Sequence, residues 1–352
     1  MPEIYVKTLR MFADGPESIP VRVSWYLADL SEAKGRQELF TRQSPQKLKV
    51  LREQALIESA VSSNRIEGVE MDRSRIGTLM FGRPALGDRD EEEIRGYRDA
   101  LNRIHTKAAG LAIDEKTILD LHGMCRGEIR DAGQYKEKDV DIIQKYPDGR
   151  QRVRFHTVPA KKTPKAMHEL LGLWHDGLRE GWVHPIVLDA ALNLDFLCTH
   201  SFRDGNGRVS RLLLLLCCYH VGLEVGRYIS LERTIEDNKE RYYETLEQCS
   251  QGWHEGKHDP WPYIGFVLYV LKSAYKEFED RLGQVSAPRG AKTEMVQKAI
   301  GSFDGEFTVR DLQSACPAVS IDLIRKTLKG MRQDGLVECL GRGRSARWRR
   351  IG

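Results

Sequence analysis

The sequence predicts a mostly α-helical protein, a helical bundle with one β-hairpin followed by a smaller C-terminal module. Apolar residues recur at helical spacing through most of residues 20–282. Residues 139–158 differ, because β-branched runs lie on either side of Pro147-Asp148-Gly149, which is typical of a hairpin. After the linker-like stretch "SAPRGAK" (286–292) the composition changes again. We therefore expect three parts: a helical region at 1–110, a core at 111–285 and a module at 286–352.

The bundle helices follow from the apolar spacing and from terminal residues. Acidic residues open the segment 90–108, which suits the positive end of a helix dipole. Asp114 is a plausible cap for the helix after it. The expected helices are 20–32, 45–61, 90–108, 114–127, 164–179, 185–199, 207–223, 234–249 and 261–282.

The C-terminal module is expected to be a winged helix. Helices are predicted at 293–302, 308–315 and 320–333, with Thr308 and Ser320 as caps of the last two. The end, "GLVECLGRGRSARWRRI", alternates apolar and polar residues around a Gly-Arg turn, as a hairpin does. Three helices and then a hairpin is the winged-helix order, and the second and third helices resemble a helix-turn-helix.

The composition is that of a soluble globular protein. Of 352 residues, 30% are charged and 41% hydrophobic. The start, "MPEIYVKTLRMFADG", lacks the apolar core of a signal peptide, and the longest apolar run, near 212–223, is too short to span a bilayer. Seven cysteines without a CxxC pair favour reduced, packed thiols. We expect a cytoplasmic protein without membrane contact.

Positive charge is concentrated at the C-terminus. Residues 291–352 hold 12 Lys and Arg against 7 Asp and Glu, while the whole chain has a net charge of only +4. A nucleic acid would therefore be sought at this module.

The stretch "HSFRDGNGRVSR", residues 200–211, places polar residues between two strongly apolar segments. Gly205-Asn206-Gly207 can adopt positive φ, so that several backbone N–H groups converge on an anion. The next helix adds free N–H donors, and Arg208 and Arg211 lie on one face of it, one turn apart. Such a set can hold a chain of phosphates.

Two further residues of this stretch could do chemistry. Asp204, beside the glycine turn, could ligate an Mg²⁺ that bridges two phosphates. His200 could take a proton from an attacking hydroxyl. A lone Gly-Asn-Gly is usually only a turn, and a lone histidine among apolar residues is usually a core residue. These simpler explanations would have to account for the whole set together, so we favour a nucleoside triphosphate site with a general base.

The same stretch resembles the signature of the Fic family, HxFx(D/E)GNGRxxR, at each fixed position. Most members have proline after the histidine, where this chain has Ser201. The resemblance extends to "ALIESAVSSNRIEG", to "ILDLHGMCRGEIRDAGQYKEKDVDI" and to "NKERYYETLEQCSQGWHEGKHDPWPYIGFVL", and covers roughly residues 20–280. It implies the Fic helical bundle, with the 139–158 hairpin as the flap that pairs with a target segment.

Fic enzymes typically transfer AMP from ATP to a hydroxyl on a protein. The resemblance then implies that His200 deprotonates the target hydroxyl and that Asp204 carries Mg²⁺. The substrates would be ATP and an unidentified protein, with the chain itself as one candidate, and a homodimer is left open. A few relatives use other nucleotides or CDP-choline as donor, but the pair of arginines favours ATP.

The remaining signature residues are expected to grip the nucleotide. Asn206 and the backbone of Gly205 and Gly207 would hold the α-phosphate. Arg208 would grip the α- and β-phosphates and Arg211 the γ-phosphate. Phe202 would anchor the loop, and Tyr243, beside Tyr242, would form the adenine wall, although both tyrosines could equally be ordinary helix core.

"SSNRIEG", residues 62–68, resembles the family's inhibitory motif (S/T)xxxE(G/N), here Ser63 to Gly68. By itself it could be only a helix end with Gly68 as its cap. The resemblance implies that Glu67 pairs with Arg211 and so occupies the guanidinium meant for the γ-phosphate. In some relatives the same glutamate positions water to remove AMP, so the chain could do both reactions.

The alternative is a DNA-binding regulator whose Fic domain senses nucleotide. Arg325, Lys326 and Lys329 would lie on the recognition helix. The wing would carry Arg342, Arg344 and Arg347, with Trp348 after them. A solvated basic surface used for docking to protein would explain the same residues. Salt-dependent binding to duplex DNA separates the two.

Overall fold

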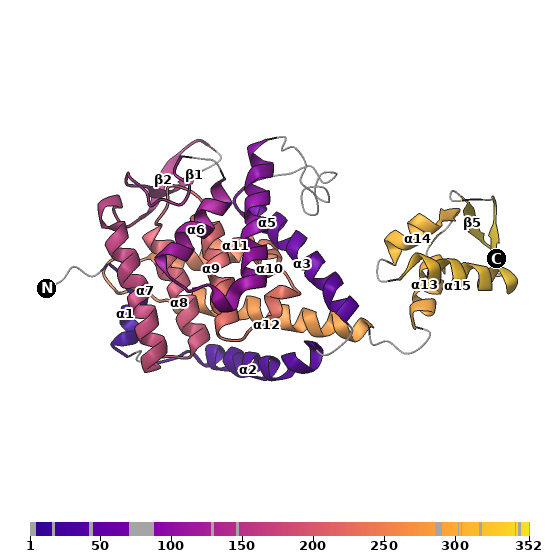
Figure 1. Ribbon diagram of the computed structural model, residues 1–352, viewed down its shortest axis with the longest axis horizontal. Helices are drawn as coiled ribbons and strands as arrows, with labels where there is room; N and C mark the ends of the chain where they lie inside the picture. Colours follow the sequence, from indigo (N-terminus) through magenta and orange to yellow (C-terminus); the bar gives the residue numbers. More distant parts are fainter. Residues whose placement is uncertain are drawn as a thin grey trace. The chain divides into compact units, whose positions relative to one another are not determined.

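The computed structural model describes residues 5–15, 18–41, 45–69, 88–127, 130–145, 148–285, 291–301, 303, 305–316, 319–341, 343 and 346–351. The chain divides into two compact units, Met1–Glu279 and Asp280–Gly352 (Figure 1). The division falls within a helix, α12 (Trp261–Val285), a few residues before the expected boundary at 286. The first 110 residues pack in the same unit as the expected core.

The first unit is a helical bundle with one hairpin, and this part of the predicted fold class is confirmed. Besides α12, its elements are α1 (Thr8–Ala13), α2 (Val21–Thr41), α3 (Pro45–Ile66), α5 (Arg89–Lys107), η1 (Ala108–Gly110), α6 (Glu115–Arg126), β1 (Asp141–Lys145), β2 (Gln151–His156), η2 (Ala160–Lys162), α7 (Thr163–Glu180), α8 (Pro185–Thr199), α9 (Asn206–His220), η3 (Val225–Arg227), α10 (Leu231–Asp237) and α11 (Lys239–Ser250).

Helices α8 and α9 form the centre of this unit. Nearly all residues of α8 are buried, and they lie on every face of the helix, as expected of a helix in the core of a protein. It packs against α1, α7 and α9, while α9 also contacts α5 and α6 (Figure 1). The loop between α8 and α9, which carries the "HSFRDGNGRVSR" stretch, is therefore fixed by the most buried part of the unit.

Buried polar residues of α8 tether distant segments. Asp195 accepts hydrogen bonds from the backbone N–H groups of Thr8 (3.0 Å) and Leu9 (2.9 Å) and from Trp253 Nε1 (2.7 Å). This is how helix α1 docks, an element that its short sequence did not predict. A buried carboxylate with three donors avoids the free-energy cost of an unpaired charge.

The cap predicted for α6 is confirmed. The Asp114 side chain accepts from the N–H of Thr117 at 2.7 Å, as expected.

The single helix predicted over 234–249 is wrong, because the chain forms α10 and α11 with a break at Asn238. Asn238 leaves the helical conformation and its side chain donates to Thr234 O at 2.9 Å, the local competition that asparagine offers a helix.

The predicted hairpin is confirmed as β1 and β2, an antiparallel pair with a bulge between Ile142 and Ile143. It docks through Phe155, which is buried and stacks on His254 with ring centroids 5.1 Å apart. Ile143 and Val153 are exposed, so these two hairpin side chains face solvent.

The second unit has its own core, and its three helices and C-terminal strand pair follow the predicted order, whereas the short strand β3 before α14 was not predicted. Its elements are α13 (Ala291–Gly301), β3 (Phe307–Thr308), α14 (Val309–Ala315), α15 (Ile321–Gln333), β4 (Val337–Cys339) and β5 (Arg347–Arg350). The strands form an antiparallel sheet in the order β3-β5-β4. Thr308 and Ser320 cap α14 and α15 as expected, and Leu312 and Leu328 lie in the buried cluster. The winged-helix assignment stays a prediction.

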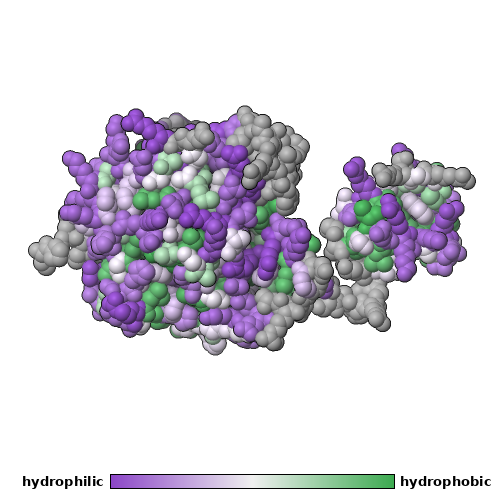
Figure 2. Space-filling model, viewed as in Figure 1, coloured by the Kyte–Doolittle hydropathy of each residue, from purple (hydrophilic) through white to green (hydrophobic). Residues whose placement is uncertain are grey.

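Hydrophilic residues cover most of the visible face of each unit, with smaller apolar patches between them (Figure 2). All seven cysteines are free thiols, and only Cys339 is not buried. Among the described residues, no helix has both the length and the apolarity that a bilayer crossing requires.

Candidate active site

The loop from α8 to α9 begins with a strained residue. His200 ends α8 with φ of +52°, and it is the only non-glycine residue with positive φ in the described part of the chain. Its backbone N–H donates to Phe196 O at 3.0 Å. Gly205, with φ of +85°, precedes the first turn of α9, where glycine adopts this conformation without a steric penalty. Strain of this kind at a non-glycine residue persists where the surroundings hold it, and it is often found at functional sites.

Side chains brace the loop from inside. The Asn206 amide donates to Phe202 O (2.8 Å) and its oxygen accepts from Phe202 N (2.9 Å). The buried Phe202 ring stacks on His122, with centroids 3.8 Å apart. Gly133 N donates to His122 Nδ1, so Nε2 carries the proton and donates to Asp204 O at 3.1 Å. The predicted anchoring by Phe202 is thus present, while Asn206, predicted to hold phosphate, already has two backbone partners.

Arg211 lies against the end of α3. Its Nε donates to Ser63 Oγ at 2.8 Å, and its Nη2 donates to Ser63 O at 2.9 Å and to Glu67 Oε1 at 2.8 Å. Gly68, which follows, has φ of +84° and its N–H donates to Arg65 O. The structure therefore brings Ser63, Glu67 and Arg211 together as the sequence predicted. We call the Arg211–Glu67 contact the inhibitory pair, after the inhibitory motif that Ser63 to Gly68 resemble.

Arg208 has a different carboxylate partner. It is fully buried, and its Nη1 donates to Glu93 Oε2 of α5 at 2.7 Å. Glu93 Oε1 also accepts from Arg126 Nη1 at 3.0 Å and, at the surface, from Arg89 at 3.2 Å. Arg126 in turn donates to Asp204 Oδ2 at 2.6 Å. One buried glutamate thus holds two arginines of the site.

These contacts act on the Asp204 carboxyl. Burial alone would raise its pKa, but Arg126, Arg208 and the N–H of Gly205 together hold the pKa of Asp204 below its usual range. The side chain is 54% exposed, so it can reach solvent. Asp204 is thus an ionised carboxylate at neutral pH, the form that binds a divalent cation.

Some buried guanidinium nitrogens have no protein partner. Arg211 Nη1, Arg208 Nε and Arg126 Nε make no hydrogen bond among the described residues. A Cβ at Gly207 would lie 2.2 Å from Glu67 Oε1 and 3.1 Å from Arg211 Nη1. A side chain at this position would therefore displace the Glu67 carboxylate from the start of α9. Unpaired buried donors of this kind are costly unless a ligand satisfies them.

A cavity of about 220 Å³ opens beside this pair. Its walls come from the end of α8, the loop, the start of α9, the hairpin, α11 and Glu67. The lining residues are Leu197, Cys198, His200, Gly207, Ile142, Arg154, Phe155, Tyr242, Tyr243, Leu246, Ser250 and Glu67. Ligand pockets usually measure about 300–1,000 Å³. The cavity is small for a nucleoside triphosphate while Glu67 occupies one side.

His200 lines this cavity and is neutral at physiological pH. Burial, and then the nearby charge of Lys136, lower the pKa of His200 to about 4, against smaller opposing effects of Glu67 and Asp204. The imidazole is therefore in the form that accepts a proton.

Lys136 is a buried residue that the motif did not reveal. Its Nζ donates to Thr199 O at 3.3 Å and to Thr157 Oγ1 at 2.7 Å, and its backbone N–H donates to Ser201 O at 3.0 Å. It therefore contacts the chain on both sides of His200. Thr157, which follows β2, donates to Val140 O, so the same lysine joins the base of the hairpin to the loop.

The sequence predicted most of the residues that meet here, and missed the buried charges behind them. Tyr243 lines the cavity and its hydroxyl donates to Ile66 O at 3.2 Å. Glu93 lies within the acidic run "DEEE", which reads only as a helix start. No local pattern separates Glu93, Arg126 or Lys136 from ordinary surface charges.

The basic residues predicted to contact DNA all belong to the second unit. Arg325, Lys326 and Lys329 are exposed on α15, and Arg325 pairs with Asp322 of the same helix at 3.8 Å. Arg347 pairs with Glu306 at 3.2 Å, while Trp348 packs on the apolar core. Arg342 and Arg344 lie outside the described residues.

Residues 112–218 match the family model described as Fic/DOC family. The chain contains a Fic domain. Over 228 residues the chain is 25% identical to protein adenylyltransferase Fic of Nematostella vectensis. This alignment covers 61% of this chain and 46% of that protein. Over 287 residues it is 22% identical to the Drosophila melanogaster protein of the same name, covering 74% and 54%. The chain spans about half the length of these curated relatives.

Solved structures show the same fold around the Fic domain. A Fic family protein from Desulfovibrio desulfuricans G20 aligns with a TM-score of 0.61 and 24% identity, over 96% of this chain and 98% of that one. A Fic domain containing signaling protein from Bacteroides thetaiotaomicron aligns with a TM-score of 0.58 and 20% identity, over 72% and 98%. These likenesses establish the fold.

Proposed function

We propose that this chain is a protein adenylyltransferase, which transfers AMP from ATP to a hydroxyl of a protein side chain. The name of the curated relatives supports this activity. The observation that carries it is the neutral His200 in one cavity with Gly207, next to buried arginines with unpaired nitrogens. Such a transfer needs a neutral base, hydrogen-bond donors that bind phosphate, and a loop of fixed shape.

In the proposed reaction the target hydroxyl oxygen attacks the α-phosphorus of ATP. The bond from that phosphorus to the bridging oxygen breaks, pyrophosphate leaves, and the hydroxyl proton passes to the imidazole of His200. Backbone N–H groups of Gly205 and Gly207 would hold the α-phosphate, with Arg208 and Arg211 along the rest of the triphosphate.

The residues fit a magnesium ion. Mg²⁺ commonly binds through one or two carboxylates together with substrate phosphates and water. Among the described residues no group of three or more His, Cys, Asp and Glu could form a closed metal site, and Asp204 is the ionised carboxylate next to the phosphate loop. Asp204 would hold the ion, which would neutralise phosphate charge, after exchanging its contact with Arg126.

We further propose that the inhibitory pair keeps this site inactive. Glu67 occupies the guanidinium fork that would grip the terminal phosphate, in a chain whose own α3 supplies the carboxylate. The same carboxylate, facing the cavity, could instead orient water for removal of AMP from a modified protein. Release of AMP from a labelled target by wild type, but not by a Glu67→Gly variant, would test that second reaction.

The function is tested by incubating the protein with Mg²⁺, α-labelled ATP and candidate protein targets. We expect label on protein from the Glu67→Gly variant, and weak or no label from wild type. Absence of label on every protein, the chain itself included, from both forms would rule the transferase out.

Lys136 should set the pH range of this transfer. Its charge lowers the pKa of His200, so Lys136→Met is expected to raise that pKa. A general base works only when unprotonated, so the acid-side decline in kcat/KM should move to higher pH. The rate profile between pH 4 and 9, measured in a Glu67→Gly background, checks this. The control is Lys138→Met, which replaces an exposed lysine two residues further on. If the acid-side decline of the rate does not move in Lys136→Met, Lys136 does not set the pH range.

A DNA-binding role for the second unit remains the alternative proposal. Lys326 and Lys329 are exposed on α15, and we find no ion pair for them among the described residues. If they contact phosphate, Lys326→Gln should weaken duplex binding for all sequences and lower the slope of log K against log salt by about one. Fluorescence anisotropy at several salt concentrations measures this, with the exposed Lys276→Gln of the first unit as control. Binding without salt dependence, or none, would remove this alternative.

A further inference from the structure

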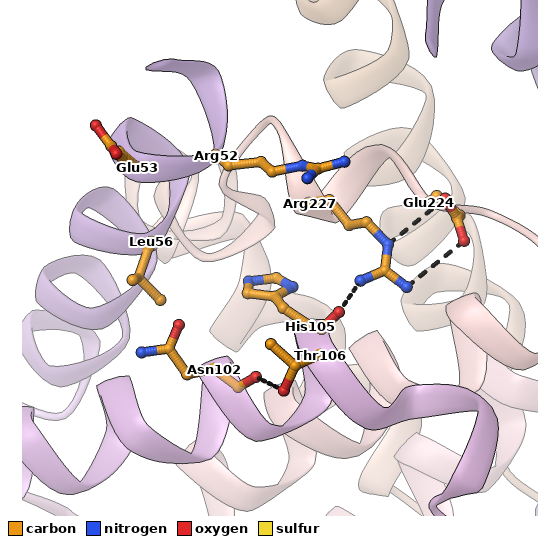
Figure 3. Close-up of a pocket in the computed structure, with 8 residues that line it drawn as sticks. All are labelled: Arg52, Glu53, Leu56, Asn102, His105, Thr106, Glu224 and Arg227. Carbon is orange, nitrogen blue, oxygen red and sulfur yellow. Dashed lines mark hydrogen bonds and ion pairs between the residues drawn. The ribbon is translucent and has the colours of Figure 1, made fainter. Parts of the chain in front are cut away.

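A second pocket, of about 520 Å³, lies between α3, α5 and η3 (Figure 3). It shares no lining residue with the cavity around His200. Its volume is within the range of small-molecule pockets. None of the chemistry described so far uses it.

Arg52 brings an uncompensated positive charge to this pocket. Its Nη2 donates to Tyr228 Oη at 3.0 Å, and its guanidinium stands over the Tyr228 ring at 5.1 Å. Among the described residues it forms no ion pair. Figure 3 shows its side chain lying across the pocket, above the His105 ring. Two of its nitrogens, Nε and Nη1, are left to bind something else.

Two neutral side chains add donors below it. His105 Nδ1 is hydrogen-bonded to Tyr219 Oη at 2.8 Å, and its Nε2 has no partner in the described part of the chain. Burial, followed by the charges of Arg227 and Arg52, lowers the pKa of His105 to about 3, so the ring is neutral. Tyr219 can then donate to Nδ1 and leave an N–H at Nε2. The exposed Asn102 amide makes no hydrogen bond within the described residues.

The acidic residues at the rim are already engaged. Glu224 accepts from Arg227 at 3.5 Å, and Arg227 also donates to His105 O and stands over the Tyr219 ring at 4.3 Å. Glu53 pairs with Lys49 at 3.9 Å, and Figure 3 shows its carboxylate turned away from His105. Among the described residues, no hydrogen bond or ion pair joins Arg52 Nε and Nη1, His105 Nε2 or the Asn102 amide to these two carboxylates.

We propose that this pocket binds a phosphate group, either inorganic phosphate or the phosphate of a small organic monoester. A guanidinium fork with added N–H donors suits a phosphate, which offers several acceptor oxygens. The bound group would connect Arg52 on α3 to Asn102 and His105 on α5.

This connection bears on the inhibitory pair, and that consequence rests on the proposed function. Arg52 and Ser63 both lie on helix α3, which ends at Ile66, next to Glu67. A ligand that holds α3 against α5 would keep Ser63 and Glu67 on Arg211, because a ligand stabilises the arrangement that it binds. Phosphate in this pocket would thus strengthen inhibition from a site distant from the loop.

Binding is tested on the full chain by isothermal titration at low salt, because exposed charges are screened as salt rises. The probes are inorganic phosphate and glycerol 3-phosphate, which distinguish free from esterified phosphate. We expect Arg52→Gln and Asn102→Asp each to weaken binding about tenfold or more, by loss of a charge-assisted donor or by repulsion. Lys107→Gln, an exposed charge loss on α5, should bind as wild type does. No binding of either probe to wild type, or unchanged binding by both pocket variants, would overturn the site.

The effect on α3 is measured without any transfer reaction. Saturating probe should slow amide hydrogen exchange of residues 59–67 in wild type and leave it unchanged in Arg52→Gln. Binding without this protection would overturn the regulatory step while leaving the transferase proposal intact. Slower exchange of residues 59–67 in a chain that never labels protein would overturn the transferase proposal and leave the effect of phosphate on α3 intact.

Discussion

Replacing Glu67 with glycine or glutamine is expected to raise the rate of AMP transfer about tenfold to a hundredfold. The charged contact between Glu67 Oε1 and Arg211 Nη2, at 2.8 Å, is partly buried, and hydrogen bonds to charged groups contribute about 1.5–3 kcal/mol. Once the contact is removed, Arg211 is free for phosphate. Initial rates of label transfer at fixed ATP, for wild type and both variants, measure the increase.

The two substitutions separate charge from space. Glutamine keeps nearly the size of glutamate and loses its charge, whereas glycine also empties the space beside Gly207. A larger gain with glycine would assign part of the inhibition to steric exclusion. Glu240→Gln, an exposed carboxylate on α11, should leave the rate unchanged. Equal rates in wild type and both Glu67 variants would show that the inhibitory pair does not control the reaction.

His200→Ala is expected to reduce transfer by about a hundredfold to ten-thousandfold, the usual contribution of a positioned general base. The loss should fall on kcat, because the imidazole is needed for the proton and not for holding phosphate. Measurement in a Glu67→Gly background keeps the starting rate high enough to follow the fall.

Two controls distinguish chemistry from folding. His168→Ala removes a histidine whose side chain is 88% exposed on α7, and should not change the rate. ATP binding by titration should be nearly unchanged in His200→Ala. A variant that still transfers AMP at more than a tenth of the parent rate would exclude His200 as the base.

The turns, the hairpin and the helix caps could be predicted, because each depends on residues that are close together in the sequence. The glycine turn, the hairpin around Pro147-Asp148-Gly149 and the caps at Asp114, Thr308 and Ser320 each follow from residues close in the chain. The approach of Glu67 to Arg211, 144 residues apart, was predicted only through the resemblance.

What could not be predicted depends on tertiary contacts. Helix α1 is docked by Asp195, which lies 187 residues from Thr8. The break at Asn238 depends on one side-chain hydrogen bond competing with helical continuation. Glu93 and Lys136 look like surface charges in the sequence, and only the packing of α5 and of the loop shows them as buried supports of the site.

The three buried arginines at the loop each have a carboxylate partner while the inhibitory pair is formed. Arg211 pairs with Glu67, Arg208 with Glu93, and Arg126 with Glu93 and Asp204. A paired charge produces little field beyond its own contact, so Arg211 attracts little free anion while Glu67 is bound to it. When Glu67 leaves, one positive charge is uncovered. Under the proposed function, Glu67 would therefore control how fast ATP arrives as well as how it binds. The rate of nucleotide capture should then be more sensitive to ionic strength in the released form than in wild type.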